Sequence, residues 1–231
     1  MRRLDSDQFA RLEKILGYQF KDPNLLRQAL SHRSVGAVHY ERLEFLGDSI
    51  LGFIIADELF KRFPDATEGQ MTRLRSNLVK GKTLAVLAKQ LSLGEFLQLG
   101  SGELKSGGFR RESILADSFE AITAGVYLES GVDKCRERLI AWYGKMLLEA
   151  DPNEITKDPK SRLQELMQSL KLPLPDYETL NVTGKDHEQM FEVQCSCLGS
   201  EKITGTKTTA IASSRRKAEG LAAEQALKIL T

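Results

Sequence analysis

The chain of 231 residues is nearly balanced in charge, with 33 Lys and Arg against 32 Asp and Glu and a net charge of +1. Its hydrophobic share of 41% is that of an ordinary globular protein, and the length suits one large domain or two modest ones. The sequence contains no apolar run long enough to span a membrane and no secretory signal after its charged start. Because Cys135, Cys195 and Cys197 are too few for a disulfide framework, we expect reduced thiols and a cytoplasmic location.

Residues 1–150 are expected to form an all-α domain. Apolar side chains recur at helical spacing from Phe9 onward. Further helices are predicted at about 24–31, 40–62, 67–78, 84–91, 112–129 and 133–149, without a convincing strand between them. Residues 151–158 are polar and include Pro152, which predicts a linker.

Residues 159–231 show a different pattern. Apolar residues from Leu163 to Leu170 are spaced for a short amphipathic helix. Strands are expected at about 177–183, 190–197 and 202–211, followed by an Ala-rich helix that begins near Ser213. The order α-β-β-β-α predicts a small α+β domain, so the fold class is multidomain, all-α followed by α+β.

An acidic stripe on the helix at 40–62 is the most informative feature. Glu41, Glu44 and Asp48 lie within about 60° of one another on a helix of 100° per residue. The apolar residues that follow surround nearly every side, so we expect this helix to be buried. Buried carboxylates need compensation of their charge.

A second acidic pair, Asp117 and Glu120, lies three residues apart on another apolar helix. If the two helices converge, their carboxylates suit a hard ion such as Mg²⁺ or Mn²⁺. The alternative is that the acids form structural salt bridges with Arg42, Arg73 or Arg75.

Several groups in residues 159–231 suit a polyanion. Cations and serines at the start of the last helix are typical of a phosphate site, because a helix N-terminus offers free N–H groups. A loop after Gly184 and a polar face of the first helix add further hydrogen-bonding groups, and neutral ones can read 2′-hydroxyls in a minor groove. These candidate RNA contacts are Ser161, Gln164, Glu165, Lys185, His187, Ser213, Ser214, Arg215, Arg216 and Lys217. Each also has an ordinary explanation as a helix cap, a solvated turn or an exposed surface residue.

The segment 100–111 is a glycine-rich basic stretch directly before the second acidic helix. It carries Lys105, Arg110 and Arg111, and it lacks the ending of a Walker loop. We interpret it as a flexible loop that holds a nucleic-acid backbone beside the acids; the alternative is a simple surface connection.

These motifs carry a resemblance to a known family. Residues 41–49, with 112–117 and Glu120, closely resemble the nuclease domain of bacterial ribonuclease III. The Gly-x-x-His-x-x-x-Phe loop from Gly184 and the basic helix start resemble the double-stranded RNA-binding domain, although Lys185 stands where that family often has proline.

The resemblance implies an endoribonuclease that cuts double-stranded RNA with Mg²⁺, for which Mn²⁺ can substitute. It implies Glu44, Asp117 and Glu120 as metal ligands, Asp48 and Glu120 as catalytic residues, and Glu41 and Glu68 as peripheral acids. It further implies a homodimer through the nuclease domain, 5′-phosphate and 3′-hydroxyl ends with short 3′ overhangs, and processing of rRNA, mRNA and tRNA precursors. The competing interpretations are a non-catalytic duplex-RNA-binding protein and a metal-dependent hydrolase of small phosphoesters.

Overall fold

The computed structural model describes residues 5–153, 158–185, 188–199 and 204–230. The chain divides into two compact units, Met1–Ile155 and Thr156–Thr231. Each unit has its own hydrophobic core.

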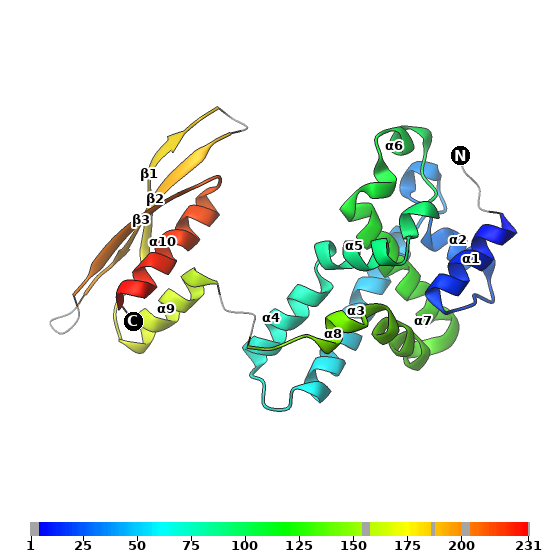
Figure 1. The fold of residues 1–231 in the computed structure, drawn as a ribbon, viewed down its shortest axis with the longest axis horizontal. Helices are drawn as coiled ribbons and strands as arrows, with labels where there is room; N and C mark the ends of the chain where they lie inside the picture. Colours follow the sequence, from blue (N-terminus) through cyan, green and yellow to red (C-terminus); the bar gives the residue numbers. More distant parts are fainter. Residues whose placement is uncertain (1–4, 154–157, 186–187, 200–203, 231) are drawn as a thin grey trace. The chain divides into compact units, whose positions relative to one another are not determined.

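Unit 1 is built from α-helices and short 3₁₀ turns (Figure 1). Its α-helices are α1 (Ser6–Leu16), α2 (Pro23–Ala29), α3 (Glu41–Arg62), α4 (Glu68–Val79), α5 (Gly81–Gln90), α6 (Ser101–Lys105), α7 (Glu112–Tyr143) and α8 (Lys145–Leu148). The 3₁₀ turns are η1 (Arg33–Val35), η2 (Leu93–Glu95) and η3 (Gly108–Arg110). In the described part of this unit the extended backbone is limited to one isolated bridge between Ser31 and Gln98, so the all-α prediction is confirmed.

The core of unit 1 is centred on α7, which packs extensively on both α3 and α5. Phe119 of α7 is fully buried, and its ring meets Trp142 and Tyr143 edge-on. The indole N–H of Trp142 donates to the carbonyl of Leu16 over 2.8 Å, which attaches the end of α1 to this core. Trp142 is therefore a packing residue.

The long helix α7 changes direction at one residue. Gly131 has φ 74° and ψ −178°, a conformation that glycine adopts without steric cost. The sequence predicts separate helices at 112–129 and 133–149, and the break at Gly131 agrees with that division.

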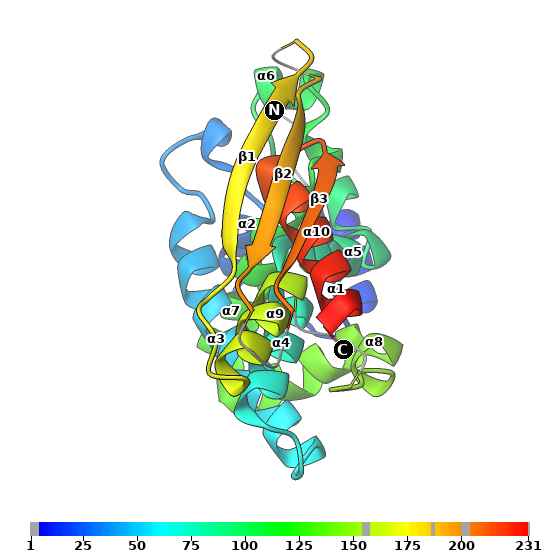
Figure 2. The ribbon, with the colours of Figure 1, turned by 90° about the vertical axis from the view of Figure 1, so that its left-hand side faces the viewer.

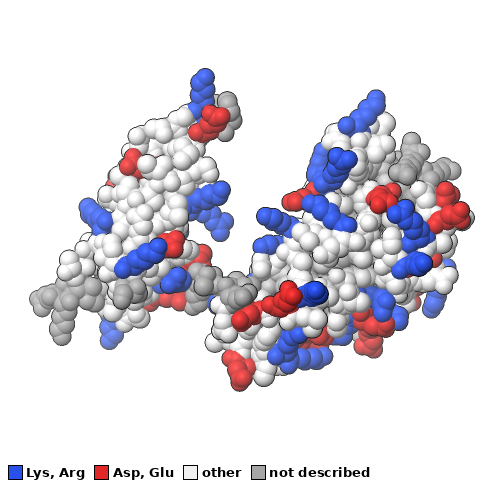
Figure 3. Space-filling model, viewed as in Figure 1, with Lys and Arg blue, Asp and Glu red and all other residues white. Residues whose placement is uncertain are grey.

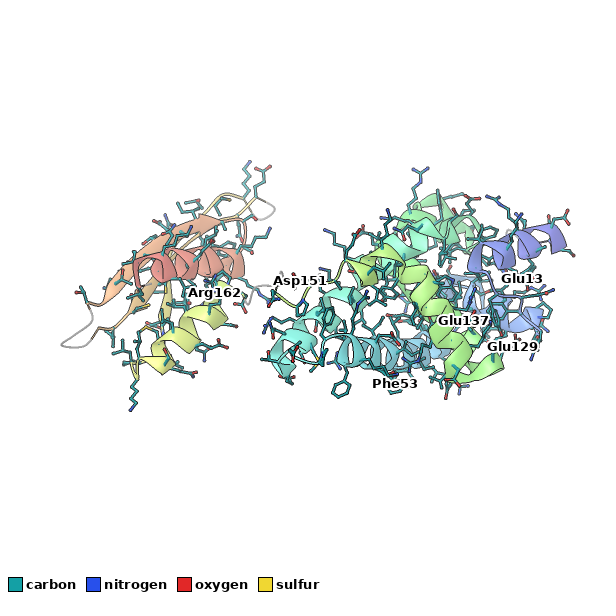
Figure 4. The ribbon with its side chains drawn as sticks, turned by 60° about the horizontal axis from the view of Figure 1, so that its bottom comes forward. Glu13, Phe53, Glu129, Glu137, Asp151 and Arg162 are labelled. Atoms are coloured by element: carbon teal, nitrogen blue, oxygen red, sulfur yellow. The ribbon has the colours of Figure 1, made fainter. Side chains whose placement is uncertain are left out.

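Two expectations for unit 1 are wrong. Helix α3 is not buried on every side, because Phe45, Phe53 and Phe60 are 79%, 56% and 68% exposed. Figure 4 shows Phe53 projecting away from the unit. The segment 100–111 is not an irregular loop, because it folds into α6 and η3.

Unit 2 has the predicted α-β-β-β-α order. It consists of α9 (Pro159–Ser169), β1 (Asp176–Thr183), β2 (Met190–Cys197), β3 (Thr206–Ala212) and α10 (Arg215–Leu230). The strands form an antiparallel sheet in the order β1-β2-β3, with α9 and α10 on one of its faces (Figure 2). Strand β3 begins later than the predicted residue 202, and residues 200–203 lie outside the described part.

The core of unit 2 joins the sheet to both helices. Leu163 and Met167 of α9 pack with Cys195 and Cys197 of β2, which face the same side as their spacing predicts. Alanines on α10 let this helix approach the sheet closely, and Thr208 donates its hydroxyl to the carbonyl of Ala222 over 2.7 Å. All three cysteines of the chain are free and buried.

None of the helices within the described residues is long and apolar enough to cross a membrane.

The separate core of unit 2 yields a prediction about stability. Leu163→Ala should lower the free energy of unfolding of this unit by about 2–5 kcal/mol, because the change leaves a cavity around a side chain with no exposed area. Leu170→Ala, the same change at a side chain that is 37% exposed, should cost about 1 kcal/mol or less.

The measurement is chemical unfolding of the full chain followed by far-UV circular dichroism and by tryptophan fluorescence. Trp142 is the single tryptophan and lies in unit 1, so its transition reports that unit alone. If Leu163→Ala shifts the midpoint of the fluorescence transition as much as that of the dichroism transition, the two cores do not unfold independently and the prediction is wrong.

Candidate functional site

Three carboxylates from two helices converge in unit 1. Glu44 comes from the first turn of α3, and Asp117 and Glu120 lie one turn apart on α7. Each offers one oxygen, and the three oxygens lie within 4.8 Å of one another. All three residues are partly buried, so the carboxylates are largely shielded from solvent while the group stays partly accessible.

Close contact between the backbones of α3 and α7 explains this convergence. A Cβ atom on Gly47 would lie 1.9 Å from the carbonyl oxygen of Glu120, a distance that no side chain tolerates. Glycine at this position therefore lets the helices touch one turn after Glu44 and at Glu120 itself. The contact sets the spacing of the acids.

Burial and mutual repulsion make these acids hard to ionise. Burial, followed by the nearby carboxylates, raises the pKa of Glu120 to about 8 and the pKa of Glu44 to about 7. Burial also raises the pKa of Asp117, against a smaller lowering effect from its hydrogen bond with Tyr40. In the part of the chain described, no lysine or arginine forms a salt bridge with any of the three, so the salt-bridge alternative fails for this group.

The other predicted acids lie outside this group. Asp48 is exposed, yet after burial its charge contributes most to the raised pKa of Glu120. Glu41 lies 3.5 Å from Arg33 and 3.8 Å from the ring of His39. Glu68 begins α4, accepts a hydrogen bond from the hydroxyl of Thr72, and faces a groove between α3 and α4.

Two residues that the sequence interpretation left aside lie at the site. Tyr40 is buried, and its hydroxyl donates to Oδ2 of Asp117 over 3.3 Å. His32 packs edge-on against the ring of Tyr40. A pocket of about 480 Å³ opens here, lined by His32, Arg33, Tyr40, Glu41, Glu44, Arg111, Ser113, Ile114 and Asp117. Tyr40 could be found only by its position directly before the acidic stripe.

The donor set of this group suits a divalent cation. Carboxylate oxygens are the ligands that Mg²⁺ and Mn²⁺ prefer, and a cation between them would offset both the burial of their charge and their mutual repulsion. Glu44, Asp117 and Glu120 are the residues that could hold it.

The basic residues of segment 100–111 differ in how far contacts with other side chains restrict them. Arg111 lines the acidic pocket and contacts Glu103 at 2.5 Å, so it is fixed beside the site. The guanidinium of Arg110 stacks on the ring of Phe109. Lys105 ends α6 and is exposed. Figure 3 shows cationic and acidic side chains interspersed over unit 1.

The candidate RNA contacts of unit 2 gather at two helix starts. Ser161 donates its hydroxyl to Asp158, which caps α9, and Ser214 caps α10 by accepting from the N–H of Lys217. A hollow of about 600 Å³ joins these starts, lined by Asp158, Lys160, Ser161, Gln164, Arg215, Arg216 and Glu219.

The remaining candidates lie at exposed positions. They are Glu165 on α9, Lys185 after β1, Ser213 before α10, and Arg216 and Lys217 in its first turn. Arg215 differs from the other cations because its Nε atom donates to Glu219 over 2.9 Å. His187 lies outside the described residues.

A helical unit with converging carboxylates, followed by an α-β-β-β-α unit with a cationic helix start, is the architecture of a nuclease that carries an RNA-binding domain. Residues 22–147 match the family described as ribonuclease-III-like, and residues 159–230 match the double-stranded RNA binding motif. The chain belongs to the ribonuclease III family of endoribonucleases, as the resemblance of residues 41–49 indicates.

Individual relatives cover nearly the whole chain. Ribonuclease 3 of Actinobacillus pleuropneumoniae serotype 3 is 54% identical over 97% of this chain and 99% of its own length. Ribonuclease 3 of Shewanella frigidimarina is 53% identical over 95% of this chain and 96% of its own. A solved nuclease domain of ribonuclease III from Campylobacter jejuni superposes with a TM-score of 0.58 at 39% identity, covering 58% of this chain and 95% of that one.

The raised pKa values predict how stability depends on pH without divalent cations. Between the unfolded value of 4.5 and the folded values of about 7 and about 8, the folded state binds more protons than the unfolded state at Glu44 and Glu120. Their contribution to stability therefore falls as pH rises through this window, and a bound divalent cation should restore it on the alkaline side.

Thermal unfolding across this pH range, in EDTA and with added Mg²⁺, checks the prediction. Glu120→Gln removes one of the titrating groups, so its stability in EDTA should decline less with pH than that of the wild type. A wild type and a variant with identical pH profiles would contradict the raised pKa of Glu120.

Proposed function

We propose that the protein hydrolyses phosphodiester bonds within double-stranded RNA in a divalent-metal-dependent reaction. The observation that carries the proposal is the convergence of Glu44, Asp117 and Glu120 in a chain that also contains the RNA-binding motif. The products are 5′-phosphate and 3′-hydroxyl ends with short 3′ overhangs. The substrates are precursors of ribosomal RNA and some messenger and transfer RNA precursors.

In this proposal Glu44, Asp117 and Glu120 hold Mg²⁺, with Mn²⁺ as an acceptable substitute. An ion held there would supply a lowered pKa for a bound water and neutralisation of charge on the phosphoryl group. Tyr40 orients Asp117 through its hydroxyl, and Gly47 fixes the separation of α3 from Glu120. Asp48 and Glu120 are the catalytic residues: Asp48, which is exposed, would hold a water or assist a second ion, and Glu120 would contact the activated water.

The peripheral acids have supporting roles. Glu41 shapes the local charge with Arg33, and Glu68 favours the first turn of α4.

The RNA duplex is held by both units. On the nuclease domain Lys105, Arg110 and Arg111 contact the backbone beside the acids. On the C-terminal domain the helix starts and the loop after β1 contact two minor grooves and the intervening phosphates by shape rather than sequence. Its contact residues are Ser161, Gln164, Glu165, Lys185, His187, Ser213, Ser214, Arg215, Arg216 and Lys217.

The proposed domain boundaries are 1–150 for the nuclease, 151–158 for the linker and 159–231 for the RNA-binding domain. Asn153 is hydrogen-bonded by the side chain of Gln70, so the linker begins as an extension of unit 1. Free cysteines agree with a reducing cytoplasmic location.

We also propose a homodimer through the nuclease domain. Phe45, Phe53 and Phe60 lie on one side of α3, where they leave an exposed apolar stripe beside a groove of about 530 Å³. Exposed apolar patches of this kind mark interaction surfaces. The Campylobacter jejuni structure is described as showing flexibility in a region involved in dimer formation of its nuclease domain, which supports a second copy as the partner.

A duplex-RNA-binding protein without nuclease activity is the alternative function. Such a protein needs the α-β-β-β-α unit but gains nothing from Glu44, Asp117 and Glu120. Holding three carboxylates together without a cation costs folding free energy. The acidic group therefore favours the enzyme.

Glu120→Gln tests the proposed activity. It should lower the rate of duplex cleavage at least about a hundredfold, because it removes a charge from the centre of the site. Affinity for the duplex should remain nearly unchanged. Glu137→Gln, the same change at an exposed position of α7, is the control and should cleave at the wild-type rate (Figure 4).

The assay uses a long labelled RNA duplex with Mg²⁺ or EDTA and a single-stranded control. Cutting of the duplex alone, dependent on Mg²⁺, supports the enzyme. Tight binding by the wild type without cutting at adequate Mg²⁺ would establish the binding protein instead.

Phe45→Ser tests the proposed dimer. Loss of an exposed aromatic anchor should weaken self-association at least about tenfold, as measured by sedimentation equilibrium. Leu128→Ser, at a side chain 53% exposed on α7, is the control and should associate like the wild type. If the wild-type protein sediments as a monomer at every concentration, the proposed homodimer is wrong.

A further inference from the structure

Glu219 is a buried carboxylate that lines the hollow between the starts of α9 and α10 in unit 2. It lies on the second turn of α10 and is only 9% exposed. One oxygen accepts from Nζ of Lys160 on α9 over 2.6 Å, and the other accepts from Nε of Arg215 over 2.9 Å. Both oxygens are thus used, each by a different helix.

Lys160 is itself held from two sides. Besides Glu219, its ammonium group lies 4.2 Å from the centre of the Tyr177 ring on β1. This cation–π contact adds to the ion pair. The group Lys160, Tyr177, Arg215 and Glu219, called the Glu219 cluster below, therefore joins α9, β1 and α10.

The Glu219 cluster remains charged despite its burial. Burial raises the pKa of Glu219, but the hydrogen bonds from Lys160 and Arg215 outweigh it and leave that pKa below its ordinary value. A buried ion pair of this kind contributes little net stability compared with apolar packing. Its position at the hollow between the helix starts suggests a role in binding.

The bond to Glu219 constrains how Arg215 meets a ligand. Glu219 engages Nε, and this leaves the two terminal nitrogens of the guanidinium for another acceptor. The side chain of Arg215 remains 61% exposed, so those nitrogens are accessible. They lie at the hollow that also contains Arg216 and Gln164.

We propose that Glu219 is a positioning residue for duplex RNA: it holds the Arg215 guanidinium toward a phosphate and, through Lys160, fixes the start of α9 against the start of α10. The inference rests on the proposed RNA binding and deepens it. Glu219 contacts no RNA and acts through Arg215.

Glu219→Gln in the full-length protein gives the test. The positioning role and a simple effect of overall charge predict opposite changes in affinity for duplex RNA. Removing a negative charge beside a polyanion site should strengthen binding if only overall charge matters. The proposal expects weaker binding, by about fivefold to tenfold at low salt, and a salt slope smaller by about one, equivalent to the loss of one phosphate contact. The readout is the affinity for a labelled RNA duplex in EDTA over a series of KCl concentrations.

The matched control is Glu224→Gln. Glu224 lies on the same helix, pairs with exposed Lys228, and loses the same charge on substitution. It should bind as well as the wild type or slightly better. Equal behaviour of Glu219→Gln and Glu224→Gln would overturn the proposal.

A double-mutant cycle with Arg215→Ala separates positioning from stability. If Glu219 acts through Arg215, then Arg215→Ala should reduce the salt slope by the same amount, and Glu219→Gln should reduce it no further in that background. Arg215→Ala with wild-type affinity would overturn the proposal, even if Glu219→Gln were too unstable to measure.

The wild type separates this inference from the proposed function. A wild type with no preference for duplex over single-stranded RNA would overturn both. A wild type that binds duplex, together with a Glu219→Gln variant that binds equally well, would overturn only the positioning role.

Discussion

The contact between α3 and α7 at Gly47 is the constraint on which the acidic site depends. The backbones meet at Glu120; along α3, Glu44 lies one helical turn before Gly47, and Asp48 follows Gly47 directly. The apolar faces of both helices continue into the core around Phe119, so packing over the whole length of the helices overcomes a local repulsion between like charges. The folded state thus contains an unfavourable repulsion between carboxylates at a place where a bound cation would reduce it.

The pKa of a glutamate shielded from solvent is shifted in opposite directions in the two units. Burial and the charges of three other acids raise the pKa of Glu120 to about 8, and within the described residues it forms no salt bridge. Glu219 has a cation on each oxygen, and its pKa falls. A glutamate therefore favours binding of an external cation in unit 1, whereas in unit 2 a glutamate orients a cationic side chain of the protein itself. The charged neighbours, more than the degree of burial, distinguish the two roles.

Periodicity and spacing predict much of this protein but not its tertiary contacts. The helical repeat places Glu44 and Asp48 on one side of α3, and the strand-like stretches from about residue 177 onward indicate the second fold. The repeat cannot distinguish an apolar side chain in the core from one on an open surface, which is why it does not predict the exposure of Phe53. Glu219 stands four residues after Arg215, a readable pair, but its bond to Lys160 joins residues distant in sequence.

The proposed dimer surface and the acidic group share helix α3. Phe45 and Asp48 lie three residues apart on α3, so their side chains are neighbours on its surface. A second copy that covers Phe45 also removes water from the surroundings of Asp48. Lower local polarity strengthens the action of every charge on its neighbours, including that of Asp48 on Glu120. Dimerisation through this stripe would therefore increase the demand of the acids for a cation, and this connects the apolar surface of α3 to the metal affinity of the site.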